Sequence, residues 1–457
     1  MLFNSKASSL FTLISKKEVM AISEKSVSIK IRDYFLKFKQ ILSDSIAIPD
    51  SHEFDAKVRD LVRRTERLTI IFQVVRNGLN QTDIPNVNKF GYRRLNSVDW
   101  IIALTSLANL LRIFVLFHNA DEPIAFYLGD PLFRSKDRLP CLALCAMVIV
   151  IMLPAREWVL YLEAKGKLKV LSIWKDYRDG ANLDKLCMNK LKIRRFRFSI
   201  YLLSLIFCYV MIIVPIFMTI VFFTPLLTNP WTYKIPRLAF YGTIWTVPLV
   251  ITITYLVNSL FGFGWFILCT YEFHLFRLLD TLDRAGILLN KTNVIIHNEK
   301  DVRTFCLLII RRLNSFELAS RKLRYVLLYN VFVYSLLGDV YIFLGVIIRI
   351  YNDILANMLA ILGIYILCLI GISGLILGNL ITKLDNLTIR MHQLTIMRKF
   401  SVNTMSKALE VMDRVAGPYN GVKVGDFLTV DKTFFILFIL ENISTLMLIT
   451  VNVRPLI

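Results

Sequence analysis

The sequence predicts an all-α integral membrane protein with seven transmembrane helices. Of its 457 residues, 56% are hydrophobic and 19% are charged, and the apolar residues come in separate long runs. Each run is long enough to cross a bilayer, which takes about 20 residues in a helix. A disordered chain is excluded because its apolar and aromatic content would be far lower.

The seven predicted spans follow one another after a polar leader. They cover about Trp100–His118, Leu139–Tyr161, Ser199–Phe223, Tyr241–Thr270, Leu327–Arg349, Ile354–Ile381 and Phe434–Thr450. Arg112 interrupts the first span, and Arg156 lies near the end of the second. The fourth span is longer than a straight crossing requires, so we expect it to tilt or to project from the bilayer.

Residues 1–98 are expected to form a cytosolic N-terminal region, and residues 99–457 the seven-helix domain. The leader is polar and basic, and it holds no apolar run long enough for a secretory signal. Ile29–Leu42 and Val58–Leu79 are amphipathic. We therefore expect two helices that lie on the bilayer surface or against the inner ends of the bundle.

The basic residues predict the orientation of the chain. With a cytosolic N-terminus, 46 of the 55 Lys and Arg residues fall in the inner parts and 7 in the outer parts. This bias fits the positive-inside rule, and Lys190–Arg197, directly before the third span, carries five basic residues. The net charge of +21 thus orients the chain, with an extracellular C-terminus. The basic segments border spans, so we expect them to face lipid and not nucleic acid.

Several enzyme signatures are missing from the sequence. It contains no P-loop, no Rossmann glycine motif and no Cys/His cluster at zinc spacing. We therefore expect no cofactor, no metal site, no catalytic residue and no enzymatic activity. The seven cysteines lie in spans or inner parts, so no disulfide framework is expected either.

Three inner segments carry apolar residues at helical spacing. Phe276–Leu289, Phe305–Tyr325 and Ile381–Met397 predict that spans four, five and six continue as helices into the cytosol. Residues 271–326 and 382–433 are therefore expected to form a cytosolic anchor region. Their apolar stripes would be buried within one chain or between subunits; the alternative is helices lying on the inner leaflet.

The C-terminal segment carries a recognisable pattern. Val424–Asp431 leads into an apolar run that ends Thr445-Leu446-Met447-Leu448-Ile449-Thr450-Val451-Asn452. This resembles the C-terminus of the insect gustatory and odorant receptor superfamily, which has gustatory-receptor-like members in nematodes and ends in Thr-Tyr, five mostly apolar residues and Gln. Thr445 matches, whereas Leu446 replaces Tyr and Asn452 replaces Gln. The departures favour a divergent branch, with a nematode-type member among the options.

The resemblance implies a gustatory or chemosensory receptor in the plasma membrane of sensory neurons. Members of this superfamily are tetrameric ligand-gated cation channels whose seventh helix lines a central pore. Their cytosolic helical extensions form an anchor domain, and their ligand pocket lies in the outer half of the bundle. The implied partners are a small-molecule stimulus, membrane lipid and the other subunits of a homo- or heterotetramer.

Four residues of the seventh span are the candidate pore lining. Glu441 lies in the middle of the span, where an ionisable side chain is costly and therefore a functional candidate. Thr445, Leu448 and Asn452 follow on the same helix face. They would supply polar groups for a hydrated cation, with Leu448 as a hydrophobic gate. The alternative is that Glu441 pairs with a base or is protonated inside the bundle.

Four further residues are the candidate ligand contacts: Trp245, Tyr255, Asp339 and Tyr365. The aromatic rings could stack on a sugar or on an apolar odorant, although aromatic residues at helical spacing also suit the core or a lipid-facing surface. Asp339 could bind a polar ligand or pair with Arg112, the only base deep in a span.

Other functions stay open at this stage. A receptor that signals through G proteins is disfavoured by the inner N-terminus, by the lack of Asp-Arg-Tyr after the third span and by the lack of Asn-Pro-x-x-Tyr in the seventh. A transporter is disfavoured because no internal repeat is evident. Sugars, bitter compounds, carbon dioxide, light and peroxide all remain candidate stimuli.

Overall fold

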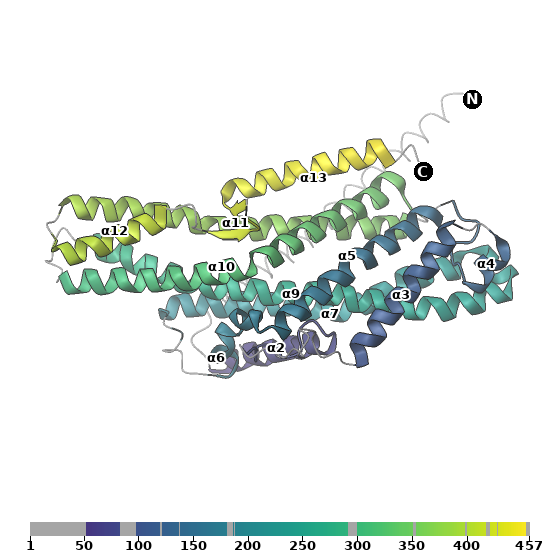
Figure 1. Ribbon diagram of the computed structural model, residues 1–457, viewed down its shortest axis with the longest axis horizontal. Helices are drawn as coiled ribbons and strands as arrows, with labels where there is room; N and C mark the ends of the chain where they lie inside the picture. The colour runs from purple at the N-terminus through teal and green to yellow at the C-terminus, as the bar shows by residue number, and fades with distance from the viewer. Residues whose placement is uncertain are drawn as a thin grey trace, which may run out of the picture. The chain divides into compact units, whose positions relative to one another are not determined.

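The structure is a computed structural model, and its described residues exclude the N-terminal 51 residues and several short segments. They are 52–82, 97–118, 121–136, 138–180, 186, 188–290, 299–350, 353–397, 400–416, 421–426 and 428–453 (Figure 1). The predicted helix Ile29–Leu42 lies outside them. The chain divides into two compact units, Met1–Ala56 and Lys57–Ile457. Apart from residues 52–56, the described residues belong to the second unit.

Helices make up nearly all the regular structure of the described residues. They are α2 (His52–Ile71), α3 (Ser97–His118), α4 (Glu122–Tyr127), α5 (Arg138–Ala164), the 3-10 helix η1 (Lys167–Trp174), α6 (Lys175–Arg178), α7 (Lys190–Thr228), α8 (Pro230–Lys234), α9 (Pro236–Asn290), α10 (Glu299–Ile342), the π-helix η4 (Phe343–Ile348), α11 (Asp353–Met397), α12 (Val402–Ala416) and α13 (Lys432–Val453). Two strands, β1 (Val422–Val424) and β2 (Leu428–Val430), form an antiparallel hairpin between α12 and α13.

Seven helices among the described residues are long and apolar enough to cross a membrane. They are α3, α5, α7, α9, α10 with η4, α11 and α13. Each contains one of the spans predicted from the sequence, except that the fifth helix ends one residue before the predicted Arg349. The all-α fold with seven apolar helices is therefore confirmed, and the protein is membrane-embedded by this measure.

Three of these helices are much longer than a bilayer crossing. The helices α9, α10 and α11 have 55, 44 and 45 residues, so each apolar span continues without a break into its amphipathic segment. Helix α12 packs against both α10 and α11 (Figure 1). The apolar stripes of these segments are buried, among them Ile309, Leu313, Phe316, Leu384, Leu387, Met391 and Val411. The chain thus buries these stripes largely against itself.

The β-hairpin docks on α10 immediately before α13 begins. Gly425 adopts a positive φ of 69° at the turn and donates its N–H to the carbonyl of Arg324, at 3.0 Å. The guanidinium of Arg324 and the hydroxyl of Tyr325 both contact the carboxylate of Asp426, each at 2.5 Å. These contacts fasten the entry of α13 to α10.

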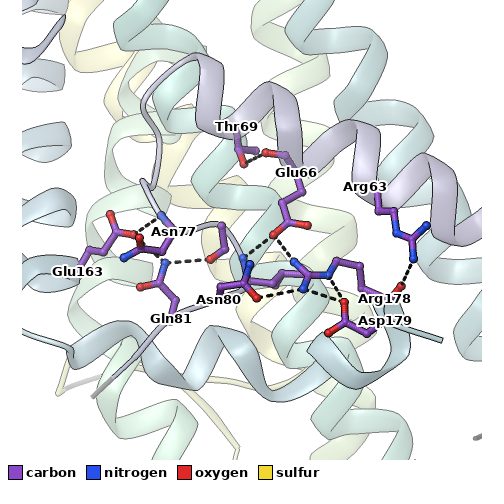
Figure 2. A network of polar contacts seen from close by, with 11 residues as sticks. Arg63, Glu66, Thr69, Asn77, Asn80, Gln81, Glu163, Arg178 and Asp179 are labelled. Carbon is purple, nitrogen blue, oxygen red and sulfur yellow. Dashed lines mark hydrogen bonds and ion pairs between the residues drawn. The ribbon is translucent and has the colours of Figure 1, made fainter. Parts of the chain in front are cut away.

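Arg178 joins α6 to α2 and to the segment that follows α2 (Figure 2). Its Nη1 lies 2.6 Å from the carboxylate of Glu66, and its Nη2 donates to the side chain of Asn80 at 3.1 Å. The same Glu66 oxygen accepts the backbone N–H of Leu79 at 2.7 Å. One buried carboxylate therefore holds both α6 and the backbone after α2.

Glu163, near the end of α5, holds the same segment from the other side (Figure 2). It accepts the backbone N–H groups of Arg76 and Asn77, at 2.8 and 2.9 Å, and the side-chain amide of Gln81, at 2.8 Å. Glu163 is buried, so these bonds replace the water that its charge would otherwise require. Residues 72–82 are consequently tied to the ends of α5 and α6.

Candidate functional site

One face of α13 packs on the rest of the chain, mainly against α11 and also against α10 and η4. The buried residues of this face are Phe434, Phe438 and Asn442, which recur every four residues. Asn442 is 5% exposed, and its side chain accepts a hydrogen bond from Ser335. In the most apolar stretch of α13 only 17% is buried, against 61% in that of α9. Helix α13 is therefore the least covered of the seven apolar helices among the described residues.

The other faces of α13 are exposed, and Glu441 lies on one of them. Leu437, Leu448 and Val451 lie on the same side of the helix and are also exposed, Leu448 by 65%. Among the described residues, no basic side chain contacts Glu441. The pairing considered as its alternative role is thus not found in this part of the chain.

The other candidate pore residues are distributed around this face. Thr445 is half-buried at the edge of the packed side. Asn452 belongs to α13, although its side chain lies outside the described residues. The structure therefore places Glu441 and Leu448 on one exposed face, with Thr445 beside it.

A cavity of about 120 Å³ lies among α3, α5, α7, α9, α10 and α11. It is close to the end of the bundle where α3 ends and α5 begins, which the charge distribution predicts to be the outer end. Its walls are almost entirely apolar, with Ile113, Val148, Phe222 and Leu359 among them. Among the described residues that line it, Arg112 alone is charged.

Arg112 is held in place by the loop after α4. Its Nε and Nη2 donate to the carbonyls of Leu128 and Gly129, both at 2.7 Å. The guanidinium also lies 5.4 Å from the ring centroid of Trp245, whose indole N–H donates to the carbonyl of Tyr127 at 3.3 Å. The candidate Trp245 does not line the cavity, but it contacts Arg112, which does.

A buried ion pair secures the other end of this loop. Asp130 is fully buried, and its carboxylate lies 2.5 Å from Nε of Arg138. It also accepts the backbone N–H of Leu132 at 3.0 Å, and Arg138 donates to the carbonyl of Leu116 at 2.8 Å. These bonds position Leu132 as part of the cavity wall.

The remaining ligand candidates lie elsewhere. Tyr255 packs edge-on against Phe72, with ring centroids 5.7 Å apart, and Tyr365 is exposed on α11. Asp339 is buried in α10, and no ion pair joins it to Arg112 within the described residues. None of the four candidates lines the cavity.

Sequence reasoning missed most of the cavity residues. Cys141, Cys145 and Tyr341 line it, but each lies within an apolar run that carries no signal of which face turns inward. Arg112 was visible in the sequence as the one base deep in a span. That interruption of an apolar run was the available signal for this site.

No group of three or more His, Cys, Asp or Glu side chains in the described part of the chain is arranged to hold a metal ion.

No protein-family model matches the chain, and no curated protein matches it either.

Proposed function

We propose that this chain is a subunit of a ligand-gated cation channel that serves as a chemosensory receptor in the plasma membrane of sensory neurons. The observation that carries the proposal is the position of Glu441 on an uncovered face of α13. Ionisable residues within spans almost always face a protein interior or a water-filled cavity. The described residues of a single chain provide neither for Glu441, whereas several α13 helices around a central axis would provide a pore.

The exposed face of α13 has the chemistry that a cation pore needs. A ring of carboxylates from Glu441 would attract cations, and a ring of Leu448 side chains would form a constriction that closes by excluding water. The number of subunits, four, comes from the resemblance of the C-terminal segment to the gustatory and odorant receptors.

The arrangement of the helices also offers a route from ligand to pore. Tyr341 of α10 and Leu359 of α11 line the cavity, and the same two helices carry the packed face of α13. A ligand that fits the cavity better in one packing of α10 and α11 would shift the population toward that packing. In this proposal, α13 follows the two helices on which it rests.

A current recording tests the proposal directly. The protein would be expressed alone, with G-protein signalling blocked, and basal and stimulus-evoked currents compared between the wild type and Glu441→Gln. We expect the substitution to lower divalent block or cation permeability, because it removes the ring of negative charge. Glu122→Gln, an exposed acid outside α13, is the matched control. Currents unchanged by Glu441→Gln would remove this face from the pore, and currents lost under the G-protein block would favour a metabotropic receptor.

The orientation needs its own experiment. Glycosylation sequons inserted within 119–138 and within 271–326 report which segment reaches the secretory lumen. We expect modification only in the first. Modification only in the second would overturn the inner N-terminus and with it the proposed pore.

A further inference from the structure

The cavity beside Arg112 has the size of a small ring. Its volume is about 120 Å³, and the described residues that form its walls carry no charge apart from Arg112. An apolar cavity of about 150 Å³ in another protein stays dry and binds benzene. A ligand of this site would therefore have a compact apolar body of about six to eight heavy atoms.

Arg112 has donor capacity that the protein does not use. A guanidinium has five N–H donors, and Arg112 uses one on Nε for the carbonyl of Leu128 and one on Nη2 for the carbonyl of Gly129. Among the described residues, no acceptor contacts its Nη1. The side chain is 4% exposed and lines the cavity, so this donor edge is withdrawn from bulk water.

Within the described residues, Arg112 forms no ion pair of its own. Asp130, whose negative charge acts on Arg112 without contacting it, is bonded to Arg138 at 2.5 Å. No other carboxylate forms an ion pair with Arg112 in the described part of the chain, and the ring of Trp245 offers only a cation–π contact. A buried cation that forms no direct ion pair is costly, and an anionic ligand would lower that cost.

The guanidinium is already oriented before any ligand arrives. The two carbonyl bonds and the Trp245 ring fix its plane, so little rotamer entropy remains to be lost on binding. A planar fork of this kind matches the geometry of a carboxylate.

We infer that the cavity binds a small apolar carboxylate, with the carboxylate on Arg112 and the apolar body against Ile113, Val148 and Phe222. This inference rests on the proposed function, because it takes the cavity as the stimulus site of the receptor. It narrows the open list of stimuli to molecules with one anionic group and no further polar group.

Thermal melting of the purified protein with benzoate, benzaldehyde and toluene at neutral pH tests the inference. A ligand that binds only the folded state raises the melting temperature according to its affinity. We expect benzoate to bind most tightly and toluene least. Arg112→Gln should weaken benzoate binding by about tenfold or more, as expected for the loss of a charge-assisted hydrogen bond, and leave toluene unchanged.

Two further variants keep the test decisive. Arg112 also holds the loop after α4, so Arg112→Gln could unfold the chain. Val148→Phe fills the cavity while leaving Arg112 in place, and it should abolish the effect of all three probes. Arg134→Gln is the matched control, because Arg134 stacks on Trp231 outside the cavity.

The outcomes separate this inference from the proposed function. Three results would overturn the carboxylate site: equal effects of toluene and benzoate on the wild type, no binding of any probe, or undiminished benzoate binding in Val148→Phe or in folded Arg112→Gln. A protein that binds benzoate through Arg112 but passes no current keeps the site and refutes the channel. If currents depend on Glu441 but the protein shows no preference for benzoate, the channel is supported and the carboxylate site is refuted.

Discussion

Ser335 of α10 donates a hydrogen bond to the side-chain oxygen of Asn442 in α13 across 2.5 Å, and Asn442 donates in turn to the carbonyl of Phe438 at 2.6 Å. Because Asn442 is the polar residue on the packed face, this bond fixes the rotation of α13 about its own axis. The adjacent Glu441 is consequently held on an exposed face.

Ser335→Ala should loosen this contact. The substitution leaves the Asn442 oxygen without its donor, and a hydrogen bond between membrane helices contributes about 0.6 kcal/mol on average and up to about 1.7. We expect a lower melting temperature for the purified protein, and altered basal currents if the rotation of α13 sets the pore. Ser444→Ala, on the exposed part of α13, is the control. Equal melting temperatures for the wild type and Ser335→Ala would show that the hydrogen bond between Ser335 and Asn442 contributes nothing to stability.

The N-terminus of α13 should be sensitive to acid through Asp431. Its carboxylate accepts the hydroxyl of Thr433 at 2.7 Å and the backbone N–H of Phe434 at 2.8 Å, and these bonds hold the pKa of Asp431 below its ordinary value of 3.8. A carboxyl group whose pKa is lowered in the folded state stabilises the protein at pH values above its ordinary pKa. This stabilisation is lost as the pH falls through the folded pKa. The melting temperature should therefore drop on acidification below about pH 4.

Two variants isolate the contribution of Asp431. Asp431→Asn can still cap the helix but does not titrate, so its melting should depend less on pH in this range than that of the wild type. Asp431→Ala removes the cap and should cost about 1 kcal/mol at neutral pH. A wild type and an Asp431→Asn variant with parallel pH profiles would contradict the assignment.

Glu163 should control the opening of residues 72–82. Glu163→Gln replaces one acceptor oxygen by a nitrogen that cannot accept, and it removes the charge from the oxygen that remains. The bonds from the N–H groups of Arg76 and Asn77 become neutral, and a hydrogen bond to a charged group contributes about 1.5–3 kcal/mol against about 0.5–1.5 kcal/mol for a neutral one. We expect trypsin to cleave after Arg76 about tenfold faster or more, because local opening governs that rate. Glu317→Gln, an exposed acid on α10, should cleave like the wild type. No acceleration in Glu163→Gln would mean that other contacts hold this segment.

Gly129→Ala should displace the loop that holds Arg112. Gly129 has a φ of +60°, and a Cβ there would collide with the backbone of Tyr241 and Gly242 in α9. We expect Gly129→Ala to lower the free energy of unfolding by about 3 kcal/mol, from backbone strain and from steric overlap together. Gly180→Ala is an informative control because Gly180 has a φ of +81° but the nearest atom to its Cβ, on Arg59, is 3.8 Å away. Equal melting of the two variants would show that steric overlap adds nothing at Gly129.

The seven helices could be predicted from the sequence because a bilayer imposes a length on every apolar span. The continuation of α9, α10 and α11 was also visible, since apolar residues recur there at the period of a helix. Glu441 was a clear candidate because a carboxylate in the middle of an apolar run has few structural roles.

The cavity could not be predicted in the same way. The partners of Arg112 are backbone carbonyls of Leu128 and Gly129, and a carbonyl leaves no trace in residue identity. The rings of Tyr255 and Tyr365 lie in predicted helices, but helical spacing alone does not say which face of a helix looks inward. The cavity itself depends on how side chains from six helices fit together, which is a property of tertiary packing.

The uncovered face of α13 also bears on how such a protein is made. In the proposed assembly, a newly synthesised subunit that has not met its partners holds Glu441 toward hydrocarbon, at a cost of about 3 kcal/mol for a charge in the middle of a span. Each subunit that joins the ring relieves this cost, so assembly is favoured by the same residue that serves conduction. An orphan subunit would remain marked by a misplaced charge, which is a feature that membrane quality control can recognise and remove.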